Sequence, residues 1–185
     1  MVYGKASVNM VREIVETLRQ NTKDRELKSH LGTLEIVRYE ITVDYSASLQ
    51  ELAEAGGYGH ISDQVRQQIS GNRFLRSTKH GRESLIIARI QFGQEILSDQ
   101  ANVLFHSVAL RSPGIVELLH WGIQYPEQQL QFPIVALGAI TQVDKTCCLV
   151  FLDGDTISSK DLLLVPYYRF WESNARFLTI CPSPS

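Results

Sequence analysis

One stretch of the sequence decides the fold: Glu117-Leu-Leu-His-Trp-Gly-Ile-Gln-Tyr-Pro-Glu-Gln-Gln-Leu-Gln-Phe-Pro-Ile-Val-Ala-Leu-Gly138. Its first part has the apolar periodicity of a helix, which Ser112-Pro-Gly opens and which Tyr125-Pro126 breaks before a second short helix. Pro133 then begins an apolar run that predicts a buried strand. The stretch holds no nucleophile with its base, no set of metal ligands and no phosphate-binding loop. It therefore specifies architecture rather than chemistry.

Short strands are predicted on both sides of this stretch. A slip in the apolar alternation of the first strand predicts a bulge or a bend near Val37, and Asp153-Gly154 has the composition of a tight turn. Alternation, or an unbroken apolar run, predicts strands over residues 33–43, 84–92, 133–141, 146–152, 162–167 and 177–180.

The predicted helices begin at serine residues that can cap an N-terminus. Ser48 and Glu51 form a capping box, Ser62 opens a helix that ends at Ser70, and Ser98 opens one that ends near residue 110. The inner face of this last helix is predicted to hold Val103, Leu104, Phe105 and Val108. An amphipathic helix is also predicted over residues 8–20.

These elements together predict an α+β fold, with helices segregated against a mostly antiparallel sheet. Residues 31–180 are expected to form one compact body, or two packed halves, 31–96 and 97–180. The N-terminal helix and a charged linker (1–30) precede this body, and residues 181–185 are expected to form a frayed tail.

Composition sets the broad class of the protein. A chain of 185 residues with 44% apolar and 21% charged residues can bury a substantial core. Its net charge of -2 gives no overall attraction to nucleic acid or to an anionic membrane, and no apolar run approaches the ~20 residues that span a bilayer. The N-terminus lacks the features of a secretory signal, and the adjacent Cys147 and Cys148 are poorly placed for a mutual disulfide. We therefore expect a reduced, cytoplasmic protein that is not associated with membranes.

No catalytic residue, metal ligand or cofactor site is predicted. Cys147 and Cys148 lie within an apolar strand, where cysteine usually acts as a small hydrophobic residue, and the histidines lack the spacing of metal ligands. His106 and His120 lie on successive predicted helices and could face each other, but the favoured alternative places each at a helix margin with its ring half exposed. An enzyme is thus not favoured, although a hydrolase or transferase with a Cys and His assembled in space stays open.

A basic window is the first candidate binding site. Between Gln64 and Arg82 the chain has no acidic residue. The aromatic Phe74 stands between cations, as in proteins that stack an aromatic ring on a nucleic-acid base. The candidate residues for nucleic acid are Arg66, Arg73, Phe74, Arg76, Lys79 and Arg82. The alternative is a solvated loop whose charge is balanced by acidic residues elsewhere in the fold.

An aromatic segment near the C-terminus is the second candidate. Tyr167-Tyr-Arg-Phe-Trp171 has too many large rings for one strand to bury, so some are expected at the surface, where Tyr, Trp and Arg are typical of binding hot spots. The predicted partner-binding residues are Tyr167, Tyr168, Arg169 and Trp171. We therefore expect a non-enzymatic binding protein, whose partner is another protein or a second copy of the chain; a nucleic-acid-binding accessory protein is the alternative.

Several motifs give a resemblance to a family. They are Val43-Asp-Tyr-Ser-Ala-Ser-Leu-Gln-Glu51, Ala55-Gly-Gly-Tyr58, Glu117-Leu-Leu119, Gly122, Tyr125-Pro-Glu127, Phe132-Pro-Ile-Val-Ala-Leu-Gly138 and Arg176-Phe-Leu178. With these motifs the chain resembles a group of small bacterial proteins without an assigned activity. The order of the elements, which ends on an Arg-aromatic-Leu strand, also faintly resembles C-type-lectin-like domains. That resemblance implies a surface that binds a ligand or a protein rather than a catalytic site.

Overall fold

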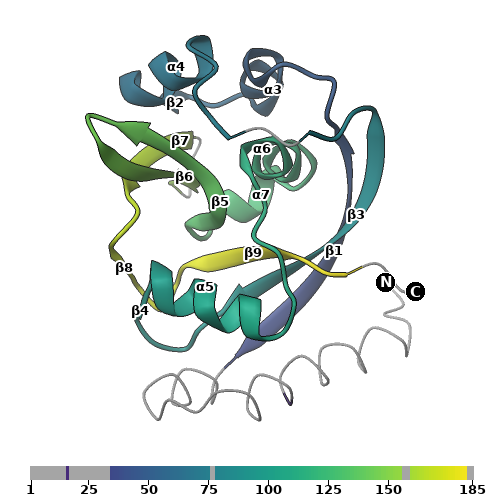
Figure 1. Cartoon of the computed structure of the whole chain (residues 1–185), viewed down its shortest axis with the longest axis vertical. Coiled ribbons are helices and arrows are strands. Elements are labelled where there is room, and N and C mark those ends of the chain that lie inside the picture. Colours follow the sequence, from purple (N-terminus) through teal and green to yellow (C-terminus); the bar gives the residue numbers. More distant parts are fainter. Residues whose placement is uncertain (1–15, 17–33, 76–77, 156–158, 183–185) are drawn as a thin grey trace.

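The computed structural model describes residues 16, 34–75, 78–155 and 159–182, and Figure 1 shows their arrangement. The predicted helix over residues 8–20 and the linker to residue 30 lie outside the described residues, apart from Glu16. Arg76 of the basic window and most of the predicted tail, residues 183–185, lie outside them as well.

A mixed sheet forms the framework of the described residues. Its strands lie in the order β1-β3-β9-β5-β6-β7-β2, with parallel pairing of β5 with β9 and of β2 with β7, and antiparallel pairing elsewhere. The strands are β1 (Glu35–Asp44), β2 (His60–Ile61), β3 (Arg82–Gln91), β5 (Ile134–Val143), β6 (Thr146–Gly154), β7 (Lys160–Pro166) and β9 (Arg176–Ile180). A second, two-stranded sheet pairs β4 (Ile96–Leu97) with β8 (Phe170–Trp171). Strands from both halves of the chain therefore share one sheet.

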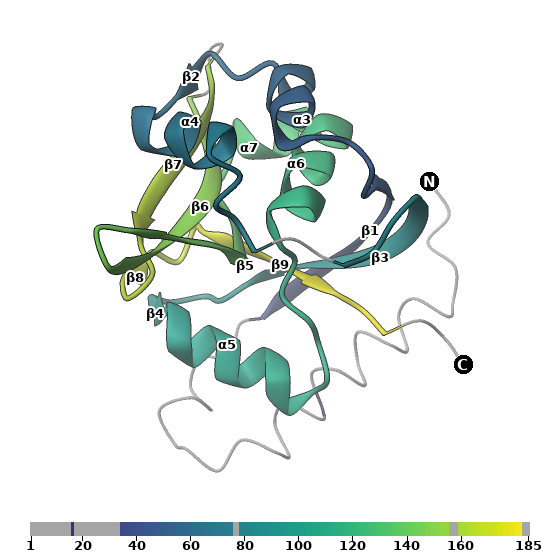
Figure 2. The ribbon, with the colours of Figure 1, turned by 45° about the horizontal axis from the view of Figure 1, so that its top comes forward.

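Helices cover both faces of the large sheet. They are α3 (Leu49–Gly56), α4 (Asp63–Ser70), α5 (Ser98–Ser107), α6 (Ile115–Gln124) and α7 (Pro126–Gln129). Figures 1 and 2 show α6 on one side of β9 and β3, with α3 and α4 beyond it, and α5 on the other side. The predicted α+β fold with a mostly antiparallel sheet is confirmed.

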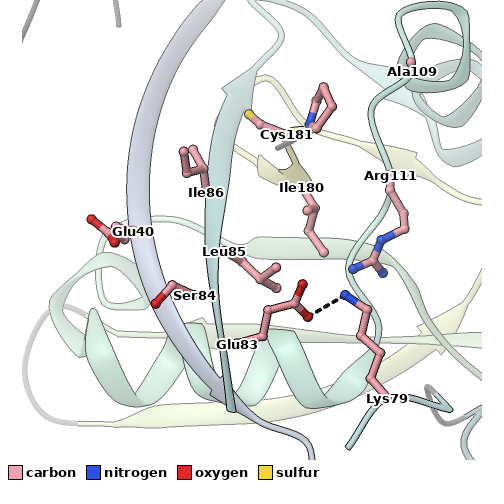
Figure 3. Close-up of a pocket in the computed structure, with 11 residues that line it drawn as sticks. Glu40, Lys79, Glu83, Ser84, Leu85, Ile86, Ala109, Arg111, Ile180 and Cys181 are labelled. Atoms are coloured by element: carbon pink, nitrogen blue, oxygen red, sulfur yellow. Dashed lines mark hydrogen bonds and ion pairs between the residues drawn. The ribbon is translucent and has the colours of Figure 1, made fainter. Parts of the chain in front are cut away.

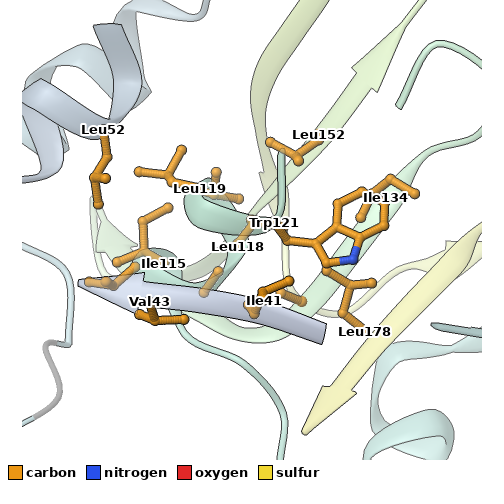
Figure 4. Packing of buried hydrophobic residues seen from close by; sticks show 14 of the residues in the cluster. Ile41, Val43, Leu52, Ile115, Leu118, Leu119, Trp121, Ile134, Leu152 and Leu178 are labelled. Carbon is orange, nitrogen blue, oxygen red and sulfur yellow. The ribbon is translucent and has the colours of Figure 1, made fainter. Parts of the chain in front are cut away.

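Two hydrophobic clusters, one on each face, hold the layers together. The first surrounds α6, whose Leu118, Leu119 and Trp121 are fully buried, as Figure 4 shows. The second lies between the sheet and α5, and includes Leu104 and Phe105. Burial of each large apolar side chain contributes about 1.5–3 kcal/mol, so the stretch around α6 is the centre of the fold rather than a site.

The first strand shows why its apolar alternation slips. β1 pairs with β3 without interruption, so of the two alternatives predicted near Val37, a bulge or a bend, the bulge was wrong. Ile36 packs in the cluster on the α5 face, whereas Ile41 and Val43 belong to the cluster around α6. The strand changes the face that it buries, and it does so without an extra residue. The register shift instead lies in β5, between Val135 and Ile140 opposite β6.

The helix caps follow the sequence in part. Ser48 forms the predicted capping box of α3, and the Ser62 side chain caps α4. Ser98 does not cap α5, because it is the first helical residue and its hydroxyl accepts a hydrogen bond from Trp171. Val103 is exposed rather than on the inner face of α5.

The tight turn lies at a different position from the predicted one. Asp153 and Gly154 are the last residues of β6 and pair with β7. The two-residue connection is between β5 and β6, where Asp144 and Lys145 have φ of 47° and 68°. Positive φ at both positions is the geometry of a hairpin turn that matches strand twist. Sequence inspection missed it because neither residue is glycine.

Candidate functional site

The aromatic segment divides its rings between the core and the surface. Tyr168 and Phe170 are 74% and 61% exposed, whereas Tyr167 and Trp171 are buried. The prediction that Tyr167 and Trp171 lie on the partner-binding surface is thus corrected. The backbone of Tyr167 forms a hydrogen bond with β6, and β8 pairs with β4, so the segment is extended. Side chains of an extended segment point alternately to opposite sides, here towards the core and towards the surface.

Trp171 anchors this segment to the body of the protein. Its Nε1 donates a hydrogen bond to Oγ of Ser98 at 2.9 Å, and its ring stands edge-on to Phe151 and Phe177, with centroid distances of 5.3 and 6.2 Å. The ring is only 2% exposed. Trp171 therefore joins β8 to the start of α5 and to the sheet, and its role is packing.

Arg169 lies between the two exposed rings. Its guanidinium carbon is 4.5 Å from the centre of the Trp171 ring, which is cation–π geometry. The backbone carbonyl of Arg169 accepts a hydrogen bond from Ser98, and its N–H donates to Tyr167 at 3.0 Å. Tyr168 stands edge-on to the buried Tyr167 at 5.5 Å. Tyr168, Arg169 and Phe170, which we call the aromatic ridge, are therefore held on a rigid base.

A polar cavity of about 360 Å³ lies beside the ridge. Arg169 and Trp171 line it, together with Phe132 and Asp153. Burial raises the pKa of Asp153, and the nearby Asp161 adds to the shift, whereas Arg169 opposes it. The cavity presents an aromatic wall, a cation and a carboxylate to a molecule of small size.

In the basic window, the ring of Phe74 is buried and two of the cations are paired with acidic residues. Phe74 is buried in the cluster around α6, so the predicted stacking on a nucleic-acid base is corrected. Lys79 forms an ion pair with Glu83, and Arg82 forms one with Asp44 at 3.0 Å. The acids that balance the charge come from strands β1 and β3, outside the window.

Two more cations of the window, Arg66 and Arg73, are exposed. Arg66 donates from Nε to the carbonyl of Ile61 at 3.1 Å. Arg73 is exposed and follows α4, and its backbone carbonyl accepts a hydrogen bond from Thr141.

A second cavity, of about 370 Å³, is shown in Figure 3 between β3, the end of β9 and the segment before α6. Lys79, Glu83 and Arg111 line it. Arg111 is paired at 3.0 Å with the buried Glu117, which also accepts hydrogen bonds from Tyr45 Oη and from the N–H of Gly114. These charges compensate one another and fix the start of α6. The polar side chains that line this cavity therefore have a structural role.

Two of the three cysteines lack the features of an activated nucleophile. All three are free thiols, with Cys147 exposed and Cys148 and Cys181 buried. Burial raises the pKa of the Cys148 and Cys181 thiols, which is the opposite of what an activated thiolate needs.

The two histidines on successive helices do not face each other. His106 is exposed on α5, whereas His120 lies on α6, on the other face of the sheet, and accepts a hydrogen bond from the Asp44 N–H at 3.0 Å. Among the described residues, no group of three or more His, Cys, Asp or Glu could hold a metal ion.

One pair of residues, Arg89 and Arg176, was not among the predicted site residues. Both side chains are buried, on neighbouring strands of the sheet. The signal was present in the sequence, since Arg89 interrupts the apolar run of Ile86 to Ile90. A charge within a predicted buried strand indicates either a paired ion or a binding group.

The comparisons with known proteins do not assign the chain to a family. No family model matches the chain, and neither does any curated protein or solved structure. The resemblance to a group of small bacterial proteins and to C-type-lectin-like domains therefore stays a prediction. Of the helices in the described part of the chain, none has the length and apolar character to cross a membrane.

Proposed function

We propose that the protein is a non-enzymatic binding protein that captures a protein partner through the aromatic ridge. The observation that carries this proposal is that two large rings, Tyr168 and Phe170, are exposed on either side of Arg169. Residues of these types, on a pre-organised base, are the ones that dominate the energy of protein interfaces. The partner is another protein or a second copy of the chain.

The geometry favours binding because the ridge loses little freedom when a partner covers it. The hydrogen bonds from Ser98 and to Tyr167 already hold the backbone at Arg169, and Trp171 holds its guanidinium. Each immobilised side chain costs about 0.5–1.5 kcal/mol on association, and a rigid ridge avoids part of that cost. The polar cavity beside the ridge offers a pocket for one side chain of the partner.

The ridge is tested by comparing the wild type with Tyr168→Ala/Phe170→Ala. Each protein is immobilised on beads and incubated with a lysate of the source cells, and the captured proteins are quantified by mass spectrometry. Sedimentation velocity over a range of protein concentrations tests whether the partner is a second copy of the chain. Leu75→Ala is the matched control, because Leu75 is exposed to a similar degree elsewhere. The double variant should lose the partner and the control should keep it. If both variants bind as the wild type does, the ridge is not the interface.

The alternatives receive less support. Lys79 and Arg82 are neutralised by Glu83 and Asp44, which weakens a nucleic-acid interface, since affinity for nucleic acid depends on free cations. The raised pKa of the buried thiols weakens the hydrolase or transferase alternative. We also propose a cytoplasmic setting, which the three free thiols support.

A further inference from the structure

Arg89 and Arg176 project from neighbouring strands onto the same face of the sheet. Arg89 on β3 pairs with Leu178 on β9, and Arg176 lies two residues before Leu178, so all three side chains point towards the α6 side. The guanidinium carbons of Arg176 and Arg89 lie 3.9 and 5.6 Å from the centre of the Phe132 ring. The two cations are therefore neighbours on one aromatic side chain.

These two cations are buried with little compensation. Arg89 and Arg176 are only 8% and 6% exposed, and the Nε atom of each is buried without a hydrogen-bond partner. Within the described residues the carboxylate in ion-pair range is that of Glu35, which lies 3.6 Å from Nη2 of Arg89 and has a side chain that is 57% exposed. Buried charges are normally paired at closer range and with all donors used.

The other contacts of the pair are neutral. Nη1 of Arg89 donates to Oε1 of Gln128, and Nη1 of Arg176 donates to the backbone carbonyl of Asn174 at 2.6 Å. Burial and the charge of Arg89 both lower the pKa of Arg176, as expected for two like charges held close together. Among the residues that the structure describes, two positive charges thus share one distant, half-exposed carboxylate.

We propose that Arg89 and Arg176 form a binding site for a small oxyanion, a phosphate or carboxylate group, that enters beside Glu35. A planar guanidinium with free N–H donors matches an oxyanion in geometry as well as in charge, and the Phe132 ring keeps the two cations in place. The Glu35 carboxylate partly neutralises the charge of Arg89 and therefore competes with the ligand. This site shares Phe132 with the cavity beside the aromatic ridge but uses different cations, and it goes beyond the proposed function.

The experiment uses the full chain labelled with ¹⁵N and follows the Nε–H signals of its arginines by NMR. Arg89→Lys and Arg176→Lys assign the two signals. Sodium phosphate and sodium succinate are titrated separately, with sodium chloride holding the ionic strength constant. At least one of the two anions is expected to shift both arginine signals saturably, without shifting the signal of Arg82. The anion that binds more tightly shows whether the natural ligand carries a phosphate or a carboxylate group. Shifts that stay linear, or that chloride reproduces, overturn the proposal.

A second variant separates a ligand site from a structural stack. Glu35→Gln removes the competing charge from an exposed side chain, so the dissociation constant for the better anion should fall at least threefold. Glu83→Gln is the matched control, because it removes a partly exposed carboxylate from the Lys79 ion pair, and it should leave that constant unchanged. If Glu35→Gln binds the anion no more tightly than the wild type, the two arginines are packing residues. This test stays valid even where an arginine variant fails to fold.

Discussion

Replacing Trp171 with alanine is expected to destabilise the protein strongly, because the structure makes this ring an anchor. The substitution deletes a side chain that is 2% exposed and contacts Phe151 and Phe177. A buried Trp→Ala change costs about 3–5 kcal/mol. It also leaves the buried hydroxyl of Ser98 without the N–H donor that lies at 2.9 Å. The free-energy cost of this lost hydrogen bond is either part of these ~3–5 kcal/mol or adds to them. For a chain of this length the loss corresponds to a fall in Tm of roughly 6–20 °C.

The assay for this prediction is thermal unfolding followed by far-UV circular dichroism, with urea unfolding as a second measure. Tyr168→Ala is the control in the same segment; since its ring is 74% exposed, its stability should stay within about 0.5 kcal/mol of the wild type. Ser98→Ala tests the hydrogen bond separately and should cost about 1–3 kcal/mol, because the Trp171 N–H stays buried without an acceptor. An unchanged Tm for Trp171→Ala, with loss of partner capture, would refute the reasoning and return the ring to the surface.

Three further results are expected. Lys145→Gly should raise the free energy of unfolding by about 0.5–1 kcal/mol in urea titrations, because glycine adopts a positive φ without strain; a loss of stability contradicts this. Ellman's reagent should label Cys147 rapidly in the native protein and the other two thiols only after unfolding; rapid labelling of all three contradicts the burial. The hydrogen bond from Arg82 lowers the pKa of Asp44 in the folded protein. The stabilising effect of this hydrogen bond is therefore present above the pKa of Asp44 in the unfolded chain and is lost as the pH falls through its pKa in the folded protein. Arg82→Gln should raise the pKa of Asp44 in a ¹³C carboxyl titration, and an unchanged pKa contradicts the pairing.

Local signals in the sequence predicted many of the elements. The capping box of Ser48 satisfies free N–H groups within one turn, and its geometry depends on residues three positions apart. The apolar runs around α6 and β5 were assigned to the core and are buried there. In each case the determining interactions lie within a few residues of each other along the chain.

Predictions that depended on distant partners failed. The bulge near Val37 was inferred from a change in apolar phase, but the change reflects two hydrophobic clusters on opposite faces of the sheet. Trp171 was placed at the surface because rings are dense in its segment, yet a hydroxyl on α5, far away in the sequence, accepts its N–H. Phe74 was placed among cations, yet it is buried in the cluster around α6.

By itself the sequence determined the α+β class, the position of most strands and helices, and the stretch around α6 as the core. Only the tertiary structure decided which rings of the aromatic segment are exposed and which cations carry uncompensated charge. The reason is physical. Periodicity and capping act over a few residues, whereas burial and charge balance depend on residues brought together from β1, β3 and β9. Arg89 shows this most clearly, since its partners Gln128 and Glu35 lie on other elements of the fold.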